Sequence, residues 1–282
     1  MTTALEFDGV DVFFPRQQSR RGERTMDGAI ADAQRGATRR DILERHDVVL
    51  AVRDVTLTIP RGAITVLVGP SGSGKSTLLR TINRLVPVTR GSVWLQAGDQ
   101  RIDVARCDDT TLRRVRRHHV SMVFQQFALL PTRTVRDNVV FGLELRGDPV
   151  SARQRVVDEK LAMVGLSEWA DRHVHELSGG MQQRVGLARA LATDPDVLLM
   201  DEPFSALDAS MRRKLQEELR ALQARLHTTI VFVTHDLDEA AWLGDQLVVI
   251  VEGRVGQVGT PRQVLDSPAS DEIADLVRHS KR

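Results

Sequence analysis

The sequence contains very little cysteine and few aromatic residues. Cys107 is the single cysteine among 282 residues, tyrosine is absent, and aromatic residues make up 4% of the chain. One cysteine excludes an intrachain disulfide and is typical of proteins from a reducing compartment. We therefore expect Cys107 to be an ordinary thiol without a functional role.

Neither sign of charge is in excess, and no hydrophobic run is long. The 39 Lys and Arg residues balance 38 Asp and Glu residues, a net charge of +1 that argues against a general binder of nucleic acid. No run approaches the ~20 apolar residues of a membrane-spanning helix, and the start of the chain does not have the pattern of a signal peptide. If the protein acts at a membrane, we expect another chain to hold it there.

The glycine-rich run GPSGSGKST at residues 69–77 carries the clearest functional signal. It fits the G-x-x-x-x-G-K-[ST] pattern of phosphate-binding loops, and it lies between an apolar strand pattern and a helix start. Backbone N–H groups and the helix N-terminus would face the phosphates of ATP, Lys75 would reach the β- and γ-phosphates, and Ser76 would bind Mg²⁺. The residues expected to contact the nucleotide are Gly69, Ser71, Gly72, Gly74, Lys75, Ser76 and Thr77.

A second motif places two carboxylates after an apolar run. The four apolar residues at 197–200 predict a buried strand, and Asp201 and Glu202 follow it. Because α/β sheets bind ligands at the carboxyl ends of their strands, we expect Asp201 to support the Mg²⁺ and Glu202 to polarise the attacking water as general base. The alternative for any Asp-Glu pair is a solvated turn, which the apolar run before it disfavours.

Strand patterns alternate with helical patterns along the chain, which predicts an α/β fold with a mainly parallel sheet. Alternating apolar residues from Leu5 to Phe14, with a slip at Gly9, predict an antiparallel N-terminal strand that contains a β-bulge. Residues 15–47 are expected to form an insert: a mobile Arg-rich loop at 16–24 and then two short helices, the second capped by Thr38. Residues from about 126 to 178 have a helical pattern and predict a subdomain inserted into the sheet.

A third motif, LSGGMQQR at residues 177–184, resembles the signature of ABC-type ATPases. A Ser-Gly-Gly run alone is ordinary loop chemistry, but further elements of that family follow in the family's order. Gln125 resembles the Q-loop glutamine, SALD at residues 205–208 resembles the D-loop, and His235 at the end of an apolar strand resembles the switch histidine. The resemblance covers nearly the whole chain.

The resemblance implies a single ABC ATPase domain over residues 1–282, with the P-loop NTPase fold. This fold would have a mainly parallel core sheet, an N-terminal antiparallel β subdomain, an inserted α-helical subdomain and a C-terminal helical tail at 260–282. Catalysis would fall to Glu202, His235 and Gln125, and Gln125 would join Ser76 and Asp201 at the metal. Two subunits, expected to be a homodimer, would sandwich ATP head to tail, each acting on its partner's nucleotide through Ser178, Gly179, Gly180 and Asp208.

An aromatic residue near the end of the first strand usually stacks on adenine in this family. Phe14 aligns best with that position, and Phe13 is the second choice. Stacking on a base is worth roughly 1–3 kcal/mol. The alternative is that both phenylalanines are core residues.

Within the family, the chain resembles the ATPase subunits of quaternary-amine importers, which take up choline, glycine betaine or related osmoprotectants. The similarity lies in the insert at residues 37–52, the run FQQFALLP at 124–131 and the run FGLELRG at 141–147. It implies a peripheral protein on the cytoplasmic face of the inner membrane, bound to transmembrane permease subunits and served indirectly by a separate substrate-binding protein, without nucleic acid. Because the sequence ends at Arg282, we do not expect the C-terminal regulatory domain of some relatives.

Residues 128–147 follow Gln125 and are expected to dock the permease. Phe127, Leu129 and Leu130 would supply an exposed apolar surface, unless they pack in the core. The alternative functions are an importer ATPase for another small solute such as an amino acid, a soluble ABC-type ATPase of DNA repair or translation, and a small-molecule P-loop kinase. The lack of sustained heptads disfavours the DNA-repair reading, and the LSGG run with His235 disfavours the kinase.

Overall fold

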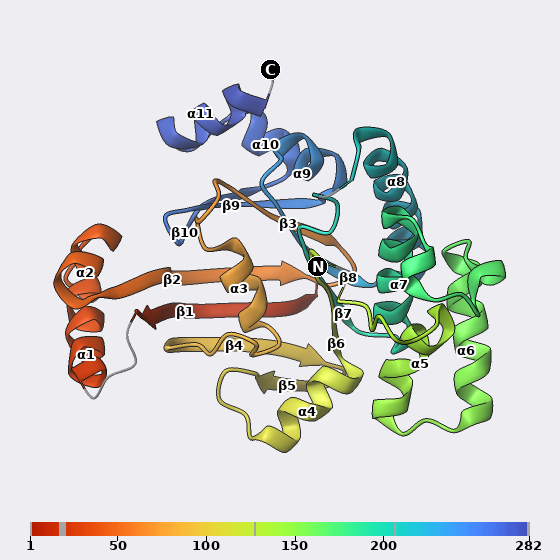
Figure 1. Cartoon of the computed structure of the whole chain (residues 1–282). Coiled ribbons are helices and arrows are strands. Elements are labelled where there is room, and N and C mark those ends of the chain that lie inside the picture. The colour runs from red at the N-terminus through yellow and green to blue at the C-terminus, as the bar shows by residue number, and fades with distance from the viewer. Residues whose placement is uncertain (1, 17–20, 127, 206, 281–282) are drawn as a thin grey trace.

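The computed structural model describes residues 2–16, 21–126, 128–205 and 207–280, and two β-sheets form its centre (Figure 1). The smaller sheet is antiparallel, in the order β2-β1-β4-β5, and consists of β1 Thr3–Pro15, β2 Val48–Pro60, β4 Arg90–Ala97 and β5 Gln100–Asp103. The larger sheet has the order β10-β9-β3-β8-β7-β6 and consists of β3 Ile64–Val68, β6 Val120–Val123, β7 Val197–Asp201, β8 Thr229–Thr234, β9 Gln246–Val251 and β10 Arg254–Gly259. Its strands pair in parallel except for β9 with β10, which confirms the expected mainly parallel α/β fold.

The parallel sheet is buried on both faces. Every residue of β3, β7 and β8 is buried, as their apolar sequences require of strands covered from both sides. On one face, α3 Lys75–Thr81 contributes Leu78 and Leu79 to a core shared with the antiparallel sheet. The other face is covered by α8 Ala209–Leu226, α9 Leu237–Leu243, α10 Pro261–Asp266 and α11 Asp271–Ser280. The carboxyl ends of β3, β7 and β8 therefore meet at one edge, where the predicted functional motifs follow them.

A group of helices forms a second core at the right of Figure 1. It contains α5 Val135–Arg146, α6 Val150–Met163, α7 Gly179–Ala192 and the short 3-10 helices η1 Ser167–Trp169 and η2 Val174–Glu176. Leu143, Leu161 and Val185 are among its buried residues. Helix α7 also packs against the main sheet through Ala190 and Leu191, so it joins the two cores.

The segment between β1 and β2 forms α1 Arg21–Gln34 and α2 Arg39–His46, at the left of Figure 1. The helices enclose a small core that includes Phe13, Ala29 and Ile42. The Thr38 side chain accepts a hydrogen bond from the backbone N–H of Asp41, which confirms the predicted cap. The expected loop at 16–24 was wrong for its last part, because α1 begins at Arg21; residues 17–20 lie outside the described part of the chain.

The sequence patterns predicted the β-bulge but missed two elements. Gly9 has a φ of 58°, and the pairing of β1 with β2 shifts register between Phe7 and Val10. The missed elements are β5 and the helix α4 Asp109–His118, which buries only Leu112 and Val115. In the described residues, no helix combines the length and hydrophobicity needed to cross a bilayer.

Candidate active site

The glycine-rich loop between β3 and α3 is shaped by close backbone contacts. Gly69 and Gly74 have φ values of 152° and 104°, and a Cβ on either would collide with a carbonyl oxygen, that of Ile250 for Gly69 and that of Ala51 for Gly74. A side chain at either position would have to displace the backbone of β9 or β2. These glycines therefore keep the loop close to both sheets, in the strand–loop–helix arrangement that the sequence predicted.

The turn between β9 and β10 also holds this loop. The backbone N–H of Gly253 donates to the carbonyl of Ser73 at 2.8 Å, and the Gly253 carbonyl accepts from the N–H of Arg53 in β2, also at 2.8 Å. A Cβ on Gly253 would lie 2.7 Å from the Ala51 oxygen. One turn thus connects the phosphate loop to the antiparallel sheet.

Lys75 is folded back over the loop that it belongs to. Its Nζ donates to the carbonyl oxygens of Gly69 at 2.9 Å and Pro70 at 2.8 Å, and the residue is only 4% exposed. Burial lowers the pKa of Lys75, while the nearby carboxylates of Glu202 and Asp201 oppose that shift. A buried ammonium that donates to two neutral carbonyls is well placed to bind phosphate oxygens.

Ser76 and Asp201 bring together oxygen atoms of the kind that Mg²⁺ prefers. The Ser76 hydroxyl donates to Asp201 Oδ1 at 2.7 Å, where the start of α3 meets the end of β7. Arg80 pairs with the other carboxylate oxygen, with its Nη2 at 2.8 Å from Oδ2. A hydroxyl and a buried carboxylate in contact beside a phosphate loop fit a Mg²⁺ that keeps several waters. The sequence analysis missed Arg80.

Glu202 and His235 form a second polar pair at the same edge. His235 Nδ1 lies 3.2 Å from Glu202 Oε2, and the Glu202 backbone N–H donates to the Val233 carbonyl at 3.1 Å. The two residues follow the neighbouring strands β7 and β8, so the parallel sheet itself sets their spacing. Glu202 has a φ of 46°, an unusual conformation for a residue other than glycine.

A pocket of about 360 Å³ lies beside the phosphate loop. Phe14 is 37% exposed and lines it, whereas Phe13 is buried in the small core under α1 and α2. Of the two predicted candidates, Phe14 is therefore the one that an adenine could reach. Arg39, the first residue of α2, also lines the pocket and was not identified in the sequence. The other lining residues are Val49, Ala51, Ser71, Gly72, Gly74, Lys75, Ser76, Thr77 and Glu202.

The signature residues lie elsewhere. Ser178 caps α7 and is exposed, Gly179 and Gly180 begin that helix, and Asp208 caps α8. Among the described residues, none of these four lines the pocket. Gln125 is exposed, and its Nε2 donates to Ser205 Oγ at 3.3 Å; among the described residues it makes no hydrogen bond to Ser76 or Asp201. Ala206 of the D-loop motif lies outside the described residues.

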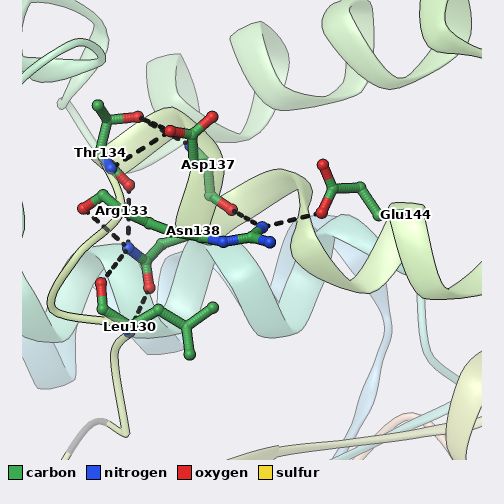
Figure 2. A network of polar contacts seen from close by, with 6 residues as sticks. All are labelled: Leu130, Arg133, Thr134, Asp137, Asn138 and Glu144. Atoms are coloured by element: carbon green, nitrogen blue, oxygen red, sulfur yellow. Dashed lines mark hydrogen bonds and ion pairs between the residues drawn. The ribbon is translucent and has the colours of Figure 1, made fainter.

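The segment that follows Gln125 is tied to α5 by one buried amide, that of Asn138 (Figure 2). Asn138 Oδ1 accepts from the Leu130 N–H at 2.8 Å, and its Nδ2 donates to the carbonyls of Leu130 at 3.1 Å and Thr134 at 2.9 Å. Leu129 and Leu130 are half-buried, so their expected exposure was wrong, and Leu129 packs against the helical core. Phe127 lies outside the described residues.

Comparison with known proteins gives the same assignment for the core. A family model described as ABC transporter matches residues 52–205. Similar proteins include the glycine betaine/proline betaine transport ATP-binding protein ProV of Salmonella typhimurium, 48% identical over 87% of this chain, and the trimethylamine N-oxide transport ATP-binding protein TmoW of Ruegeria pomeroyi, 46% identical over 83%. The chain spans 60% of the length of ProV and 68% of TmoW.

A solved structure agrees in fold. The dimeric ATP-binding cassette MJ0796, in a post-hydrolysis state bound to ADP and Pi, superposes with a TM-score of 0.73 and 30% sequence identity, over 92% of this chain and 99% of that one. The family match and the relatives, together with the loop, the carboxylates and the signature motif, show that the chain belongs to the ABC transporter family, in its ATP-binding component.

Proposed function

We propose that the chain binds and hydrolyses Mg·ATP and thereby powers a membrane importer for glycine betaine, proline betaine or a related quaternary amine such as choline. The observation that carries the ATPase part is the meeting of the phosphate loop, the Ser76–Asp201 pair and the Glu202–His235 pair at one edge of the parallel sheet. The substrate part rests on relatives. ProV is named for glycine betaine and proline betaine, and OpuAA of Bacillus subtilis, 45% identical over 86% of this chain, for glycine betaine.

In ATP hydrolysis the protein contributes mainly by positioning the reacting groups and by stabilising the charge that develops on the phosphate. Lys75 exchanges its two carbonyl partners for oxygens of the β- and γ-phosphates, and the loop N–H groups donate to the same chain of phosphates. Ser76 and Asp201 would hold Mg²⁺, which would supply positive charge to neutralise the phosphates. Glu202 accepts the proton of the attacking water, and His235 holds the Glu202 carboxylate in place.

A second copy of the chain completes each site in this proposal. Ser178 and the start of α7 are not among the described residues that line the chain's own pocket, which supports a role on the nucleotide of a partner. The MJ0796 cassette, described as dimeric, supports the same arrangement. ATP then supplies contacts that close the dimer, and loss of phosphate removes them.

The helical region would carry this cycle to permease subunits in the membrane. Gln125 begins the segment that leads to α5, and Asn138 clamps the segment so that a shift of its start moves the helix with it. Leu145, Val150 and Trp169, which are 53%, 75% and 38% exposed, are large apolar side chains of this region that a partner could cover. The chain itself would be peripheral, on the cytoplasmic face, with the substrate held by a separate binding protein.

Importers for other solutes are the main competing function. The sulfate/thiosulfate import ATP-binding protein CysA of Nocardia farcinica is 47% identical, nearly as similar as ProV, but over 80% of this chain rather than 87%. The longer match to ProV favours the quaternary amine. In a strain from which the other quaternary-amine importers have been removed, deletion of this protein should abolish glycine betaine accumulation under osmotic stress, while sulfate uptake stays normal. The reverse pattern would reassign the substrate and leave the ATPase untouched.

The ATPase part is tested separately on purified protein. Lys75→Ala should abolish hydrolysis and weaken ATP binding, because the phosphate chain loses its buried cation. Lys214→Ala is the matched control, since Lys214 is exposed on α8 and outside the pocket. Hydrolysis by Lys75→Ala at the rate of Lys214→Ala would refute the phosphate-loop assignment.

A further inference from the structure

Arg39 comes to the nucleotide pocket from an element outside the recognised motifs. It is the first residue of α2, directly after the cap residue Thr38, in the helical segment between β1 and β2. It is half-buried and lines the pocket of about 360 Å³ together with Phe14, Ser71 and Lys75. None of the expected functions of the phosphate loop, the carboxylate pair or the signature uses it.

The Arg39 guanidinium is fixed at one end and weakly engaged at the other. Its Nε donates to the Leu50 carbonyl at 2.6 Å, which orients the side chain against β2. Nη1 and Nη2 both lie 3.4 Å from one acceptor, the carbonyl oxygen of Gly72 at the tip of the phosphate loop. Two hydrogen bonds of this length to one neutral oxygen are weak, so they leave most of the hydrogen-bonding capacity of the guanidinium unused.

The surroundings of Arg39 favour an anionic ligand. Burial lowers the pKa of Arg39, because the cation is partly removed from water. The negative charge of Glu252 opposes this shift. Gly72, its partner, has a φ of 76°, and a Cβ built there would meet nothing within 4 Å, so the space above the loop tip is open. A planar guanidinium binds phosphate oxygens through two parallel N–H groups.

We infer that Arg39 is a second phosphate-binding cation of this pocket, which takes the phosphate chain of a nucleoside di- or triphosphate opposite Lys75. The inference rests on the proposed ATP-binding function and adds to it a residue supplied by the insert. On binding, Nη1 and Nη2 leave the Gly72 oxygen for phosphate oxygens, while the Nε bond to Leu50 remains. The base lies against Phe14 and Val49, which line the same pocket.

The test compares three ligands and four variants of the full chain. Affinities for ATP, ADP and AMP are measured by calorimetric titration without metal, for Arg39→Ala, Arg39→Gln, Arg39→Lys and the control Arg40→Ala. Arg40 is the next residue, but it is exposed and pairs with Glu44 at 2.7 Å on the outer face of α2. Arg39→Ala and Arg39→Gln should weaken ATP and ADP about tenfold or more and AMP far less, because a charge-assisted pair to the terminal phosphates is lost.

Two further readouts separate phosphate binding from a structural role. The loss of nucleotide affinity in Arg39→Ala and Arg39→Gln should become smaller as the salt concentration is raised. Arg39→Lys should recover part of the affinity, because lysine keeps the positive charge but not the two parallel N–H groups. The melting temperature of each ligand-free variant reports on the Leu50 contact independently. Arg40→Ala should match the wild type in every measurement.

Each other outcome overturns the inference in a distinct way. Equal losses for AMP, ADP and ATP would assign Arg39 to the base or ribose instead. A lower melting temperature with unchanged affinities would make it a structural contact between α2 and the loop. If the wild-type chain binds no nucleotide at all, the proposed function fails and takes this inference with it, whereas failure of Arg39 alone leaves wild-type binding intact.

Discussion

The two regions that carry the motifs differ in how fully their polar groups are used. At the sheet edge, Asp201 is buried and both of its oxygens have partners, Ser76 and Arg80. At the start of α7, Ser178 is exposed, its one capping contact to the Met181 N–H is long at 3.4 Å, and a Cβ on Gly179 would meet nothing within 4 Å. In the first region the polar side chains satisfy one another within the chain, whereas in the second the described residues leave the polar groups largely exposed.

This difference follows from how each region is built. Parallel strands deliver side chains to one edge with fixed spacing, so the sheet assembles a site without help from another chain. A helix start in an outlying region offers N–H groups and a hydroxyl but encloses nothing. The contrast is the one that the proposed dimer requires, in which the sheet edge forms within one chain and the start of α7 acts on the nucleotide of the partner.

The largest effect on ATP hydrolysis is expected from a change at the sheet edge. Glu202→Gln should slow hydrolysis by at least ~10²-fold, because the amide cannot accept the proton of the attacking water. ATP binding should persist, since Glu202 contributes no cation to the phosphates. The variant should accumulate as an ATP-dependent dimer on size-exclusion chromatography. A variant that stays monomeric with ATP present would argue against the two-chain site.

A positive charge at the exposed start of α7 tests the proposed contact with the nucleotide of the partner. Ser178→Arg should lower hydrolysis about tenfold or more yet leave nucleotide binding of each chain intact, because a bulky cation obstructs closure on the partner's ATP. Ser151→Arg, a like change at an exposed position on α6, is the control and should have no effect. Hydrolysis by an isolated Ser178→Arg monomer at the control rate would contradict action across the interface.

Mixing two inactive variants sharpens the comparison further. A heterodimer of Ser178→Arg and Lys75→Ala has one composite site with both defects and one site with neither. If the two sites work independently, the mixture should regain part of the wild-type activity. Recovery cannot occur if each chain acts on its own nucleotide, because every chain then carries one defect.

The rigidity of the helical region depends on the buried side chain of Asn138, which is 0% exposed. Asn138→Ala should lower the free energy of unfolding by about 2–3 kcal/mol, because the buried amide bonds are lost: the N–H of Leu130 loses its partner, and the carbonyls of Leu130 and Thr134 keep only their backbone donors. Glu144→Ala removes only a half-exposed ion pair to Arg133 and should cost less than ~1 kcal/mol (Figure 2). Equal urea midpoints for the two variants would contradict this reading.

The smallest expected effect is on stability as a function of pH, and it concerns the buried carboxyl of Glu239 on α9. Burial raises the pKa of Glu239, which accepts a hydrogen bond from Gln216 at 2.9 Å. A raised folded-state pKa means that the stability this group contributes is present at low pH and is lost as pH rises through that pKa. Glu239→Gln should therefore be more stable than the wild type at pH 8, and the difference should shrink as the pH falls. A constant difference in melting temperature from pH 4 to 8 would refute it.

The site residues that follow buried strands could be predicted because local sequence sets their position. The run before Asp201 is apolar enough to identify a covered parallel strand, and the end of such a strand is a ligand-binding edge. The glycines of the phosphate loop likewise belong to one continuous pattern. In both cases the chemistry and the element that holds it are adjacent in the chain.

Arg39 and Arg80 could not be predicted on the same grounds. Arg39 reaches the loop only because the insert packs against β2, and nothing in its own neighbourhood distinguishes it from Arg40. Leu129 and Leu130 were misjudged because loop position suggests exposure, whereas the Asn138 amide bonds the Leu130 backbone to α5 and Leu129 packs against the helical core. Tertiary packing decides these positions, and the sequence patterns describe only local structure.

The turn at Gly253 has a consequence for engineering the chain. Tight turns between strands usually accept inserted tags or new termini, because little depends on their backbone. Here the Gly253 backbone bonds both to Ser73 and to Arg53, so a peptide inserted between β9 and β10 would separate the loop from β2. The turn at Gly98, between β4 and β5, has open space around its Cα and is the better place for a fluorescent label or an affinity tag.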